Sequence, residues 1–373
     1  MIYLDSAATS FLKPASVEKA MVRAIHTMAS PGRGAYTQAM RASDMVYECR
    51  ELAGELFNFE DTERIVFTSN ATHSLNIAIR SMAKKGDKVV ISGYEHNSVT
   101  RVLNDIGAKV VVAEAPLYDT DAVISSFDTC LNGAKLAVCN HISNVFGFVQ
   151  PIYEIAELCR RKNIPLIVDA SQSAGVGTID AARLNAAFIA MPGHKGLLGP
   201  QGTGILLCGE EPAPILFGGT GSDSIVQTMP GYLPDLLEAG THNIPGIAGL
   251  SEGIRFVLGK SPKKIGEYER YLCRRMAEKL KHIDELEIFS TESDCQAGVL
   301  SLRHAVMEPE KLCEMLGKRG IACRCGLHCA PIAHKTAGTL DTGTLRMSFS
   351  PFNSEKEVLT AANVLENIIV HKK

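Results

Sequence analysis

The chain has 373 residues, more than a single hydrophobic core usually serves, so its length predicts two domains. Hydrophobic residues make up 46% of the chain and charged residues 21%, and 38 basic against 41 acidic side chains leave a net charge of -3. This balance, without a basic run or an aromatic-interleaved patch, argues against a nucleic-acid partner, and the lack of a long apolar run argues against a membrane span.

The first residues, "MIYLDSAATS", have neither the charged nor the apolar region of a signal peptide, so we expect a cytoplasmic protein. Eleven cysteines in a chain without an export signal indicate reduced thiols rather than a disulfide framework. Several of them lie within apolar segments, where we expect buried thiols: Cys49, Cys139, Cys159, Cys208 and Cys273.

Between about residues 63 and 208, short β-branched runs alternate with helix-period segments. The runs are "RIVFT", "KVVIS", "KVVVAEA", "KLAVCN", "PLIVDA", "AFIAM" and "GILLC". Several are apolar throughout, which is typical of strands covered on both faces. Helices are expected between them, for example at 72–85 and 152–161. The pattern predicts an α/β fold with a mostly parallel sheet and helices on both of its faces.

The C-terminal third has a pattern of its own. It is strongly helical from about 247 to 283 and then mixes strands with helices, including a strand at "GTLRMSFS". Ser354 and Glu357 are spaced as a capping box for a last helix. We therefore expect a large domain at 14–255 and a smaller α+β domain formed by 1–13 together with 256–373.

Polar residues follow the predicted strands at the edge where open α/β sheets bind their ligands. After the first strand, "SNATHS" enters a helix, and its free N–H groups with the Thr72 hydroxyl would suit a phosphate. The later strands are followed by other candidate ligands: His96, Asn144, Gln172, His194 and Lys195.

Asp169 closes a nearly pure hydrophobic strand and therefore needs a cationic or hydrogen-bonding partner. Lys195 follows the next predicted strand. An aspartate facing a pyridine nitrogen, a lysine able to form a Schiff base and a helix N-terminus for a phosphate together describe a site for pyridoxal 5′-phosphate. Taken singly, each has a plainer interpretation: a helix cap for Asp169, a solvated loop residue for Lys195, a structural histidine for His96. Their positions at successive strand ends favour the cofactor.

A set of motifs then resembles one known family, the class V, fold-type I pyridoxal-phosphate enzymes, and among them the cysteine desulfurases and selenocysteine lyases. The motifs are "YLDSAAT", "EHNS", "SNVFG", "VDASQSAG", "GHKG" with "GPQGTGIL", "EAGT" and "RCGLHCAP". They run from Tyr3 to Phe352. The resemblance implies a homodimer, an amino-acid substrate and an acceptor protein for sulfur or selenium.

The same resemblance implies roles for individual residues. Lys195 is similar to the lysine that binds the cofactor aldehyde, Asp169 to the partner of the pyridine nitrogen, and His96 to the ring that stacks on the cofactor. The other implied cofactor contacts are Ala71 and Thr72 at the helix start, Asn144 and Gln172 near the ring hydroxyl, His194 at the phosphate, and Thr241, reaching across from the other subunit. Arg346, with Asn144, resembles the substrate-carboxylate site, and Cys329 the nucleophile that takes the sulfur.

Three departures from the family pattern stand out. Leu327 occupies the place of a histidine that precedes the cysteine in the short-loop group, and "GLHCAP" with "IAHKTAGTLDTGT" resembles a desulfurase-like branch. Pro192 and Ala71 stand where many relatives have hydroxyl residues. More of the phosphate binding is then expected from backbone N–H groups, His194 and Thr241.

The segment "RCGLHCAP" has three interpretations. Cys323, Cys325, His328 and Cys329 are a possible zinc set, but the spacing is tight and no second pair follows, while "IACRC" alternates like a strand. A Cys325–Cys329 disulfide is disfavoured in a reducing compartment. We favour a nucleophile at Cys329, with Arg324 and His328 as cationic neighbours that promote the thiolate. The role of Cys325 stays open, as does proton transfer by His96.

The expected reaction converts L-cysteine to L-alanine and leaves the sulfur on Cys329 as a persulfide. Release of selenium from L-selenocysteine is the nearest alternative, because nothing in the sequence separates the two elements. A class V aminotransferase or β-lyase on another amino acid is a further alternative. A sulfur-binding module without catalysis is disfavoured by the presence of Asp169, Lys195 and Arg346.

Overall fold

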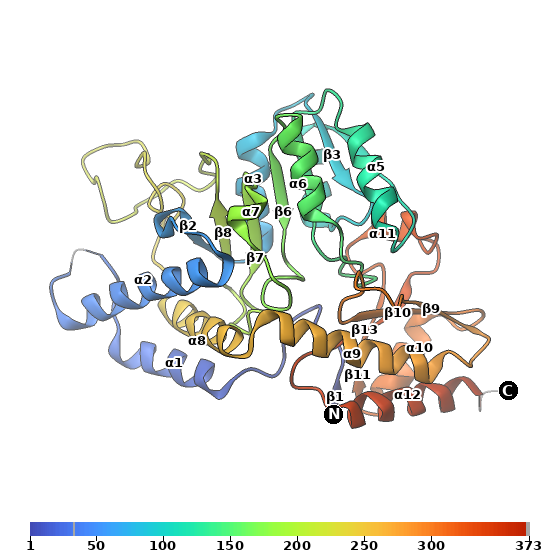
Figure 1. Ribbon diagram of the computed structural model, residues 1–373. Coiled ribbons are helices and arrows are strands. Elements are labelled where there is room, and N and C mark those ends of the chain that lie inside the picture. Colours follow the sequence, from blue (N-terminus) through green and yellow to red (C-terminus); the bar gives the residue numbers. More distant parts are fainter. Residues whose placement is uncertain (33, 371–373) are drawn as a thin grey trace.

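The computed structural model describes residues 1–32 and 34–370, and its described part contains two main sheets that lie side by side (Figure 1). The larger has seven strands in the order β2-β8-β7-β6-β5-β3-β4. Their bounds are β2 (Ile65–Thr68), β3 (Lys88–Ser92), β4 (Lys109–Ala113), β5 (Leu136–Asn140), β6 (Leu166–Asp169), β7 (Phe188–Pro192) and β8 (Gly204–Cys208). Only β8 runs antiparallel to its neighbours in this described sheet, which confirms the expected mostly parallel arrangement.

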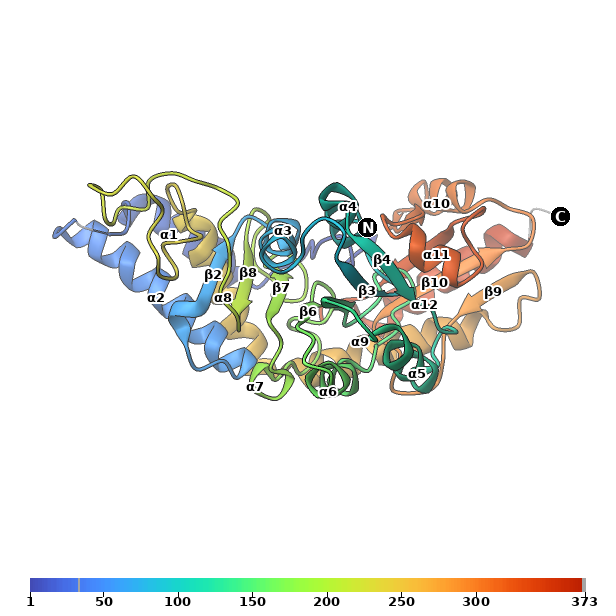
Figure 2. The same cartoon turned by 90° about the horizontal axis from the view of Figure 1, so that it is seen from above.

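Helices cover both faces of the large sheet, as Figure 2 shows from above. On one side lie α3 (Ala71–Met82) and α4 (Asn97–Ile106), and on the other α5 (Thr120–Cys130), α6 (Ile152–Arg161) and α7 (Ala181–Leu184). Alternate residues of one strand enter different cores: Val89 and Ile91 pack with α3 and α4, whereas Val90 packs with α5 and α6. Such strands must be apolar on both faces, which is why they read as continuous hydrophobic runs.

The N-terminal helices α1 (Ala15–Thr27) and α2 (Thr37–Phe57) pack against α8 (Ile244–Lys260), and α9 (Pro262–Leu280) continues toward the smaller sheet. The helical pattern expected from 247 to 283 is therefore two helices, separated at Ser261. The break has a local cause, because Pro262 has no N–H to donate and restricts the residue before it.

The smaller sheet has the order β12-β13-β10-β9 in the described part of the chain. It comprises β9 (Leu286–Phe289), β10 (Val299–His304), β12 (Arg324–Gly326) and β13 (Thr344–Ser348), with α10 (Pro309–Gly317), α11 (Pro331–Thr336) and α12 (Glu355–Val370) around it. The strand expected at "IACRC" is divided, because β11 (Ile321–Ala322) pairs instead with β1 (Ile2–Tyr3). Leu4 lies in the same buried cluster as α9 and α12. The exact domain boundaries at 13/14 and 255/256 stay a prediction.

Two further expectations are met. Ser354 and Glu357 form the predicted capping box, since the Ser354 N–H donates to Glu357 Oε2 (2.8 Å) and the Glu357 N–H donates to Ser354 Oγ (3.3 Å). Every cysteine is a free thiol, and the five that were expected to be buried are buried. Among the described residues, no helix has the length and apolar character needed to cross a membrane.

Candidate active site

The polar residues that follow the parallel strands meet in one cavity of about 520 Å³ at the carboxyl edge of the large sheet. Of the nine residues expected to contact a cofactor, all but Thr241 line it: Ala71, Thr72, His96, Asn144, Asp169, Gln172, His194 and Lys195. They come from segments more than a hundred residues apart in the sequence. The sheet brings them together, because the carboxyl ends of its parallel strands share one edge.

Lys195 and Asp169 both face this cavity. Burial lowers the pKa of Lys195 to about 8, while the charge of Asp169 acts in the opposite direction. The Asp169 side chain is itself only 4% exposed, and its Oδ1 accepts a hydrogen bond from the Ser171 N–H at 2.9 Å. The site thus pairs a fixed buried carboxyl group with an amine that is neutral in part near pH 8.

The start of helix α3 forms one end of the cavity. The first N–H groups of a helix have no partner within it. Here Asn70 Oδ1 accepts a hydrogen bond from the His73 N–H at 2.9 Å. The Thr72 hydroxyl lies 2.9 Å from that of Ser98. Burial lowers the pKa of His194 to about 4, so its ring is neutral and can offer an N–H donor. This end of the cavity is suited to an anion such as a phosphate group.

His96 precedes helix α4 and caps it. Its Nδ1 accepts a hydrogen bond from the Ser98 N–H at 3.1 Å, and burial lowers the pKa of the ring to about 4. Since a backbone N–H only donates, Nδ1 is the acceptor and the neutral ring carries its proton on Nε2. In this state His96 can donate a hydrogen bond from Nε2 but cannot accept a proton there.

The loop with Cys329 is held at three points. The Cys329 carbonyl oxygen accepts a hydrogen bond from the Asn97 N–H (2.8 Å), and the His328 carbonyl oxygen accepts one from Asn144 Nδ2 (2.8 Å). In addition, His328 Nε2 lies 3.1 Å from the Thr344 carbonyl oxygen. His328 and Cys329 have φ angles of 47° and 56°, in the left-handed region that non-glycine residues seldom occupy. Such a backbone persists only where its surroundings hold it, as they do here, with the Cys329 side chain exposed.

One expectation about this loop was wrong. His328 is buried, and burial lowers its pKa to about 2, with the charge of Arg346 adding to the effect. The ring is therefore neutral and supplies no positive charge to the Cys329 thiolate. Of the two cationic neighbours predicted from the sequence, His328 is therefore excluded, and the effect of Arg324 on Cys329 stays a prediction.

Cys325 lies on the face of the smaller sheet opposite to that of Arg324 and Arg346. In the β12–β13 register Arg324 is opposite Arg346 and Cys325 is opposite Leu345, so the two residues of β12 project to opposite sides. Burial raises the pKa of Cys325 to about 12, and the nearby Cys313 adds to the rise. Cys325 is thus a protonated thiol that faces away from Arg346. In the part of the chain that the structure describes, no cluster of three or more His, Cys, Asp or Glu residues is arranged to hold a metal ion.

Arg346 is 1% exposed and binds an acidic residue that sequence reasoning missed. Its Nη2 donates to Asp5 Oδ1 at 2.6 Å and its Nη1 to the Asn144 carbonyl at 2.9 Å, whereas its buried Nε has no partner. Asp5 follows β1, inside the motif "YLDSAAT". Ser98, which contacts both Thr72 and His96, was also missed, although it belongs to the quoted motif "EHNS".

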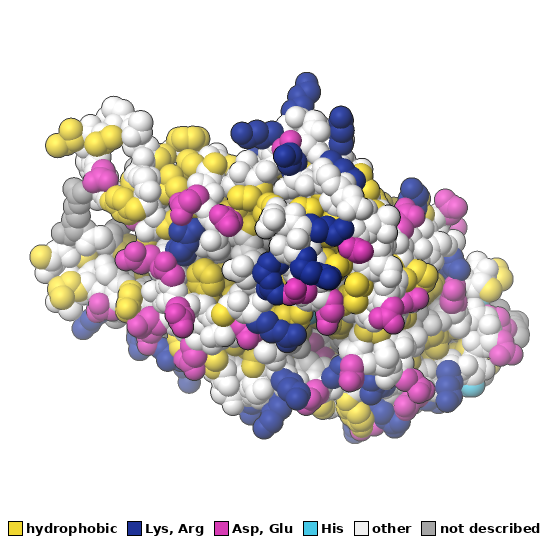
Figure 3. All heavy atoms as spheres, turned by 45° about the horizontal axis from the view of Figure 1, so that its top comes forward, with side chains coloured by type: hydrophobic (Ala, Val, Ile, Leu, Met, Phe, Trp, Pro, Cys, Tyr) yellow, Lys and Arg dark blue, Asp and Glu magenta, His cyan; other side chains and the backbone are white. Residues whose placement is uncertain are grey.

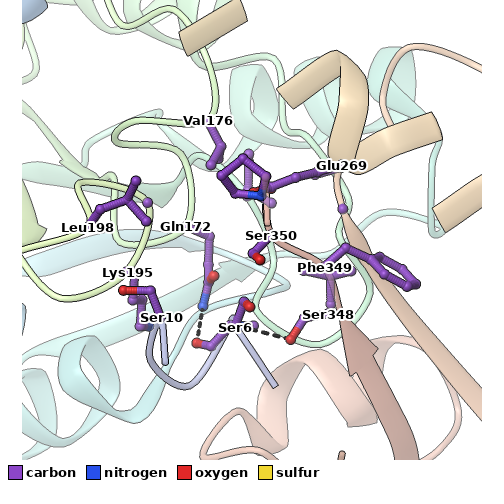
Figure 4. A pocket seen from close by; sticks show the side chains of 17 residues that line it. Ser6, Ser10, Gln172, Val176, Lys195, Leu198, Glu269, Ser348, Phe349 and Ser350 are labelled. Carbon is purple, nitrogen blue, oxygen red and sulfur yellow. Dashed lines mark hydrogen bonds between the residues drawn. The ribbon is translucent and has the colours of Figure 1, made fainter. Parts of the chain in front are cut away.

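A second cavity of about 460 Å³ lies behind Lys195, between the two sheets (Figure 4). Gln172 borders both cavities and donates from Nε2 to the Ala7 carbonyl at 3.0 Å. Glu269 reaches the same space from α9, and burial raises its pKa well above the usual value. Gln172 therefore ties the cofactor side of the site to the N-terminal segment.

Thr241 lies outside the main cavity. It lines a separate hollow of about 810 Å³ together with His73, in the first turn of α3, and Ser69, which precedes that helix. Within one chain it therefore does not face the space that holds Lys195 and Asp169.

The residues present fit pyridoxal phosphate. The cavity offers a partly neutral lysine amine, a buried carboxyl group and a helix start suited to a phosphate. It also contains an unused acceptor, because the buried Asn144 Oδ1 has no hydrogen-bond partner among the described residues. A ring hydroxyl would supply the missing donor.

Known proteins share this fold and much of the sequence. The family model for class V aminotransferases matches residues 2–360. A probable cysteine desulfurase of Pyrococcus abyssi is 32% identical and covers 99% of this chain and 94% of that protein; one of Methanothermobacter thermautotrophicus is 33% identical, with 98% and 94% covered. The apo structure of a cysteine desulfurase from Thermococcus onnurineus superposes with a TM-score of 0.89 at 32% identity, covering 99% and 94% of the two chains. The Escherichia coli desulfurase CsdA gives 0.85 at 26%, covering 98% and 94%.

Proposed function

The chain belongs to the class V aminotransferase family and, within it, to the cysteine desulfurases, and from this premise we propose that it converts L-cysteine to L-alanine and carries the released sulfur on Cys329. The observation that carries the proposal is the single cavity lined by both Lys195 and Asp169, to which Asn144 and Asn97 tie the loop of Cys329. An amine, a carboxyl group and a thiol are the three groups that this reaction requires.

Pyridoxal phosphate, held by Lys195 and Asp169, would supply an electron sink for bond changes at the substrate Cα. The Asp169 carboxylate would keep the pyridine nitrogen protonated. Thr72, His194 and the N–H groups at the start of α3 would bind the phosphate, and Asn144 and Gln172 would lie near the ring hydroxyl. His96 borders the same space and would stack on the ring.

Lys195 is the residue suited to take the substrate Cα proton. Its pKa of about 8 leaves part of the amine neutral at mildly alkaline pH, which is the form that accepts a proton. His96 would donate a hydrogen bond from Nε2 and would not accept this proton, since its Nδ1 is already bound by the Ser98 N–H and its Nε2 carries the hydrogen. This assignment gives the two groups complementary roles.

Cys329 then acts on the substrate sulfur. A new bond forms between Cys329 Sγ and the substrate Sγ while the substrate Cβ–Sγ bond breaks, and its electron pair stays with the amino-acid fragment. That fragment takes up protons and becomes L-alanine, so one L-cysteine and one thiol give one L-alanine and one persulfide. Arg346 would hold the substrate carboxylate and align the reacting atoms.

The proposal is tested by incubating the purified protein with pyridoxal phosphate and L-cysteine and measuring amino-acid products. We expect L-alanine in amounts that match the sulfur mobilised, and loss of that product in Cys329→Ala. Formation of pyruvate in place of L-alanine would instead indicate a β-lyase and contradict the proposal.

We also propose a homodimer in which Thr241 of one chain reaches the phosphate end of the other site. The segment between β8 and α8 exposes large apolar side chains, among them Phe217 (73%), Val226 (58%) and Ile225 (96%). Hydrophobic side chains gather on this side of the molecule (left in Figure 3), where α1 and α2 also expose Ile25 and Met40. An apolar surface of this kind supports an interface between copies. Light scattering of the purified protein measures the mass directly.

The persulfide would pass to a thiol of an acceptor protein, because the Cys329 side chain is exposed and open to a partner. A cytoplasmic location accords with this chemistry, since eleven free thiols need a reducing compartment.

A further inference from the structure

Arg324 lies directly opposite Arg346 on neighbouring strands of the smaller sheet. The strands β12 and β13 are antiparallel, and their register pairs these two residues. Side chains at paired positions project from the same face, with Cβ atoms about 5 Å apart. Arg324 therefore leaves the sheet on the side on which Arg346 contacts Asp5 and Asn144.

The electrostatic influence of Arg324 reaches the catalytic cavity. Burial is the largest cause that lowers the pKa values of Lys195, His96 and Arg346, and the charge of Arg324 adds to it in all three cases. The charge of the guanidinium thus acts on the amine, the ring and the buried arginine, although Arg324 is exposed to solvent.

Asp5 is the acidic residue that pairs with one of these two arginines. Asp5 pairs with Arg346 at 2.6 Å, whereas the Arg324 side chain makes no hydrogen bond or ion pair with any described residue. Like charges at directly opposed positions of a sheet destabilise it, so a second anion between Arg324 and Arg346 would reduce their repulsion. The buried Arg346 Nε, which has no partner, provides an unused donor at the same place.

We propose that Arg324 is a second substrate-binding residue, which together with Arg346 binds the α-carboxylate of the amino acid while Asp5 stays in place as the permanent counter-ion of Arg346. This inference rests on the proposed function. Arg346 would bind the carboxylate from the buried side and Arg324 from the open side. The positive charges of Arg324 and Arg346 would then be neutralised by Asp5 and the substrate carboxylate.

The arrangement defines the class of ligand that the site accepts. A small amino acid with a single carboxylate balances the two arginines, whereas an amine without that group leaves their repulsion in place. Arg324 therefore contributes to specificity through the substrate carboxylate. Its loss should weaken binding of L-amino acids and leave binding of the corresponding amines unchanged.

The test compares L-alanine with ethylamine, which differs from it only by the carboxylate, as ligands of the cofactor-loaded protein. Dissociation constants are measured by calorimetry in wild type, Arg324→Gln, Arg324→Lys and Arg346→Gln. Arg319→Gln is the matched control, because it removes an exposed arginine from the same half of the molecule. Melting temperatures show whether each variant is folded, and Arg346→Lys replaces Arg346→Gln if the latter is not.

We expect Arg324→Gln to raise the dissociation constant of L-alanine about tenfold, as the loss of a charge-assisted hydrogen bond does. The constant for ethylamine should change less than twofold, Arg324→Lys should recover part of the loss, and Arg319→Gln should match wild type. The melting temperature of ligand-free Arg324→Gln should not fall, since the substitution removes one of two opposed cations.

Equal changes for both ligands, or no change for L-alanine, overturn the inference. Arg346→Gln separates this failure from that of the proposed function. If Arg346→Gln selectively weakens L-alanine and Arg324→Gln does not, Arg324 is not a substrate ligand, but the carboxylate site at Arg346 stands. If Arg346→Gln also treats the two ligands alike, the carboxylate site itself is wrong.

Discussion

The two halves of the active site are built differently. The cofactor half is formed by strand ends of the large sheet, where Asp169 is buried and Lys195 lies in the turn after β7. The thiol half is a loop with left-handed φ angles at His328 and Cys329, tied down by hydrogen bonds and open to solvent at the thiol. A rigid sheet edge suits a cofactor that stays in place, and a tethered loop suits a sulfur that must leave.

The largest loss of activity is expected on substitution of Lys195, in the cofactor half. Lys195→Ala removes both the cofactor anchor and the base, so we expect alanine formation to fall by at least about a thousandfold. The control is Lys162→Ala, which removes a half-buried lysine that pairs with Asp128 and does not line the cavity. Production of alanine by Lys195→Ala at more than a few per cent of the wild-type rate would remove Lys195 from the mechanism.

Loss of the hydrogen bond that links the two halves, from Asn144 to the His328 carbonyl, is expected to give the next largest effect on turnover. Asn144→Ala removes the hydrogen bond from Nδ2 to the His328 carbonyl and leaves the main-chain contact with Arg346. We expect the turnover rate to fall about tenfold to a hundredfold, and Cys329 to react faster with iodoacetamide because its loop is held less firmly. Unchanged alkylation with reduced turnover would show that Asn144 acts on the substrate alone.

The cofactor half predicts a pH dependence. The neutral amine of Lys195 is the form that reacts with an aldehyde, and a pKa lowered to about 8 makes that form dominant above pH 8. The rate at which cofactor-free protein takes up pyridoxal phosphate should therefore rise about eightfold from pH 6.5 to 7.5 and level off above about pH 9. A rise that continues to pH 10 would mean that the amine has its ordinary pKa.

The smallest effect is expected at Glu269, behind both halves. Because burial raises its pKa, the folded protein keeps this proton at pH values at which the unfolded chain has lost it. Stability is then greatest below the ordinary glutamate pKa and declines as the pH rises above it. Glu269→Gln should raise the melting temperature at pH 8 by about 3 °C and leave it unchanged at pH 4.5. An equal shift at both pH values would contradict the raised pKa.

The cofactor half was also the more predictable from sequence. The strands around Val90 and Val138 are apolar on both faces, so they stand out as continuous runs, and the polar residues that follow them had to share one sheet edge. Eight of the nine expected cofactor contacts line the cavity for that reason. Thr241 lies apart, and its role depends on a second copy.

The thiol half depends on contacts between distant segments. The Asp5–Arg346 ion pair joins residues 341 positions apart, and no local pattern marks it. His328 lies in a loop, yet it is buried against Thr344, which removes the charge expected of it. Neither the division of "IACRC" into β11 and β12 nor the orientation of Cys325 follows from alternation alone, since each depends on which strand pairs with which.

Tandem mass spectrometry of the peptide that contains both Cys325 and Cys329 tests the central claim most directly. After brief exposure of the cofactor-loaded protein to L-cysteine, we predict one added sulfur atom on Cys329, removable by a thiol reductant and missing in Lys195→Ala. Added sulfur on Cys325, or alanine formed with no sulfur on Cys329, would contradict the account.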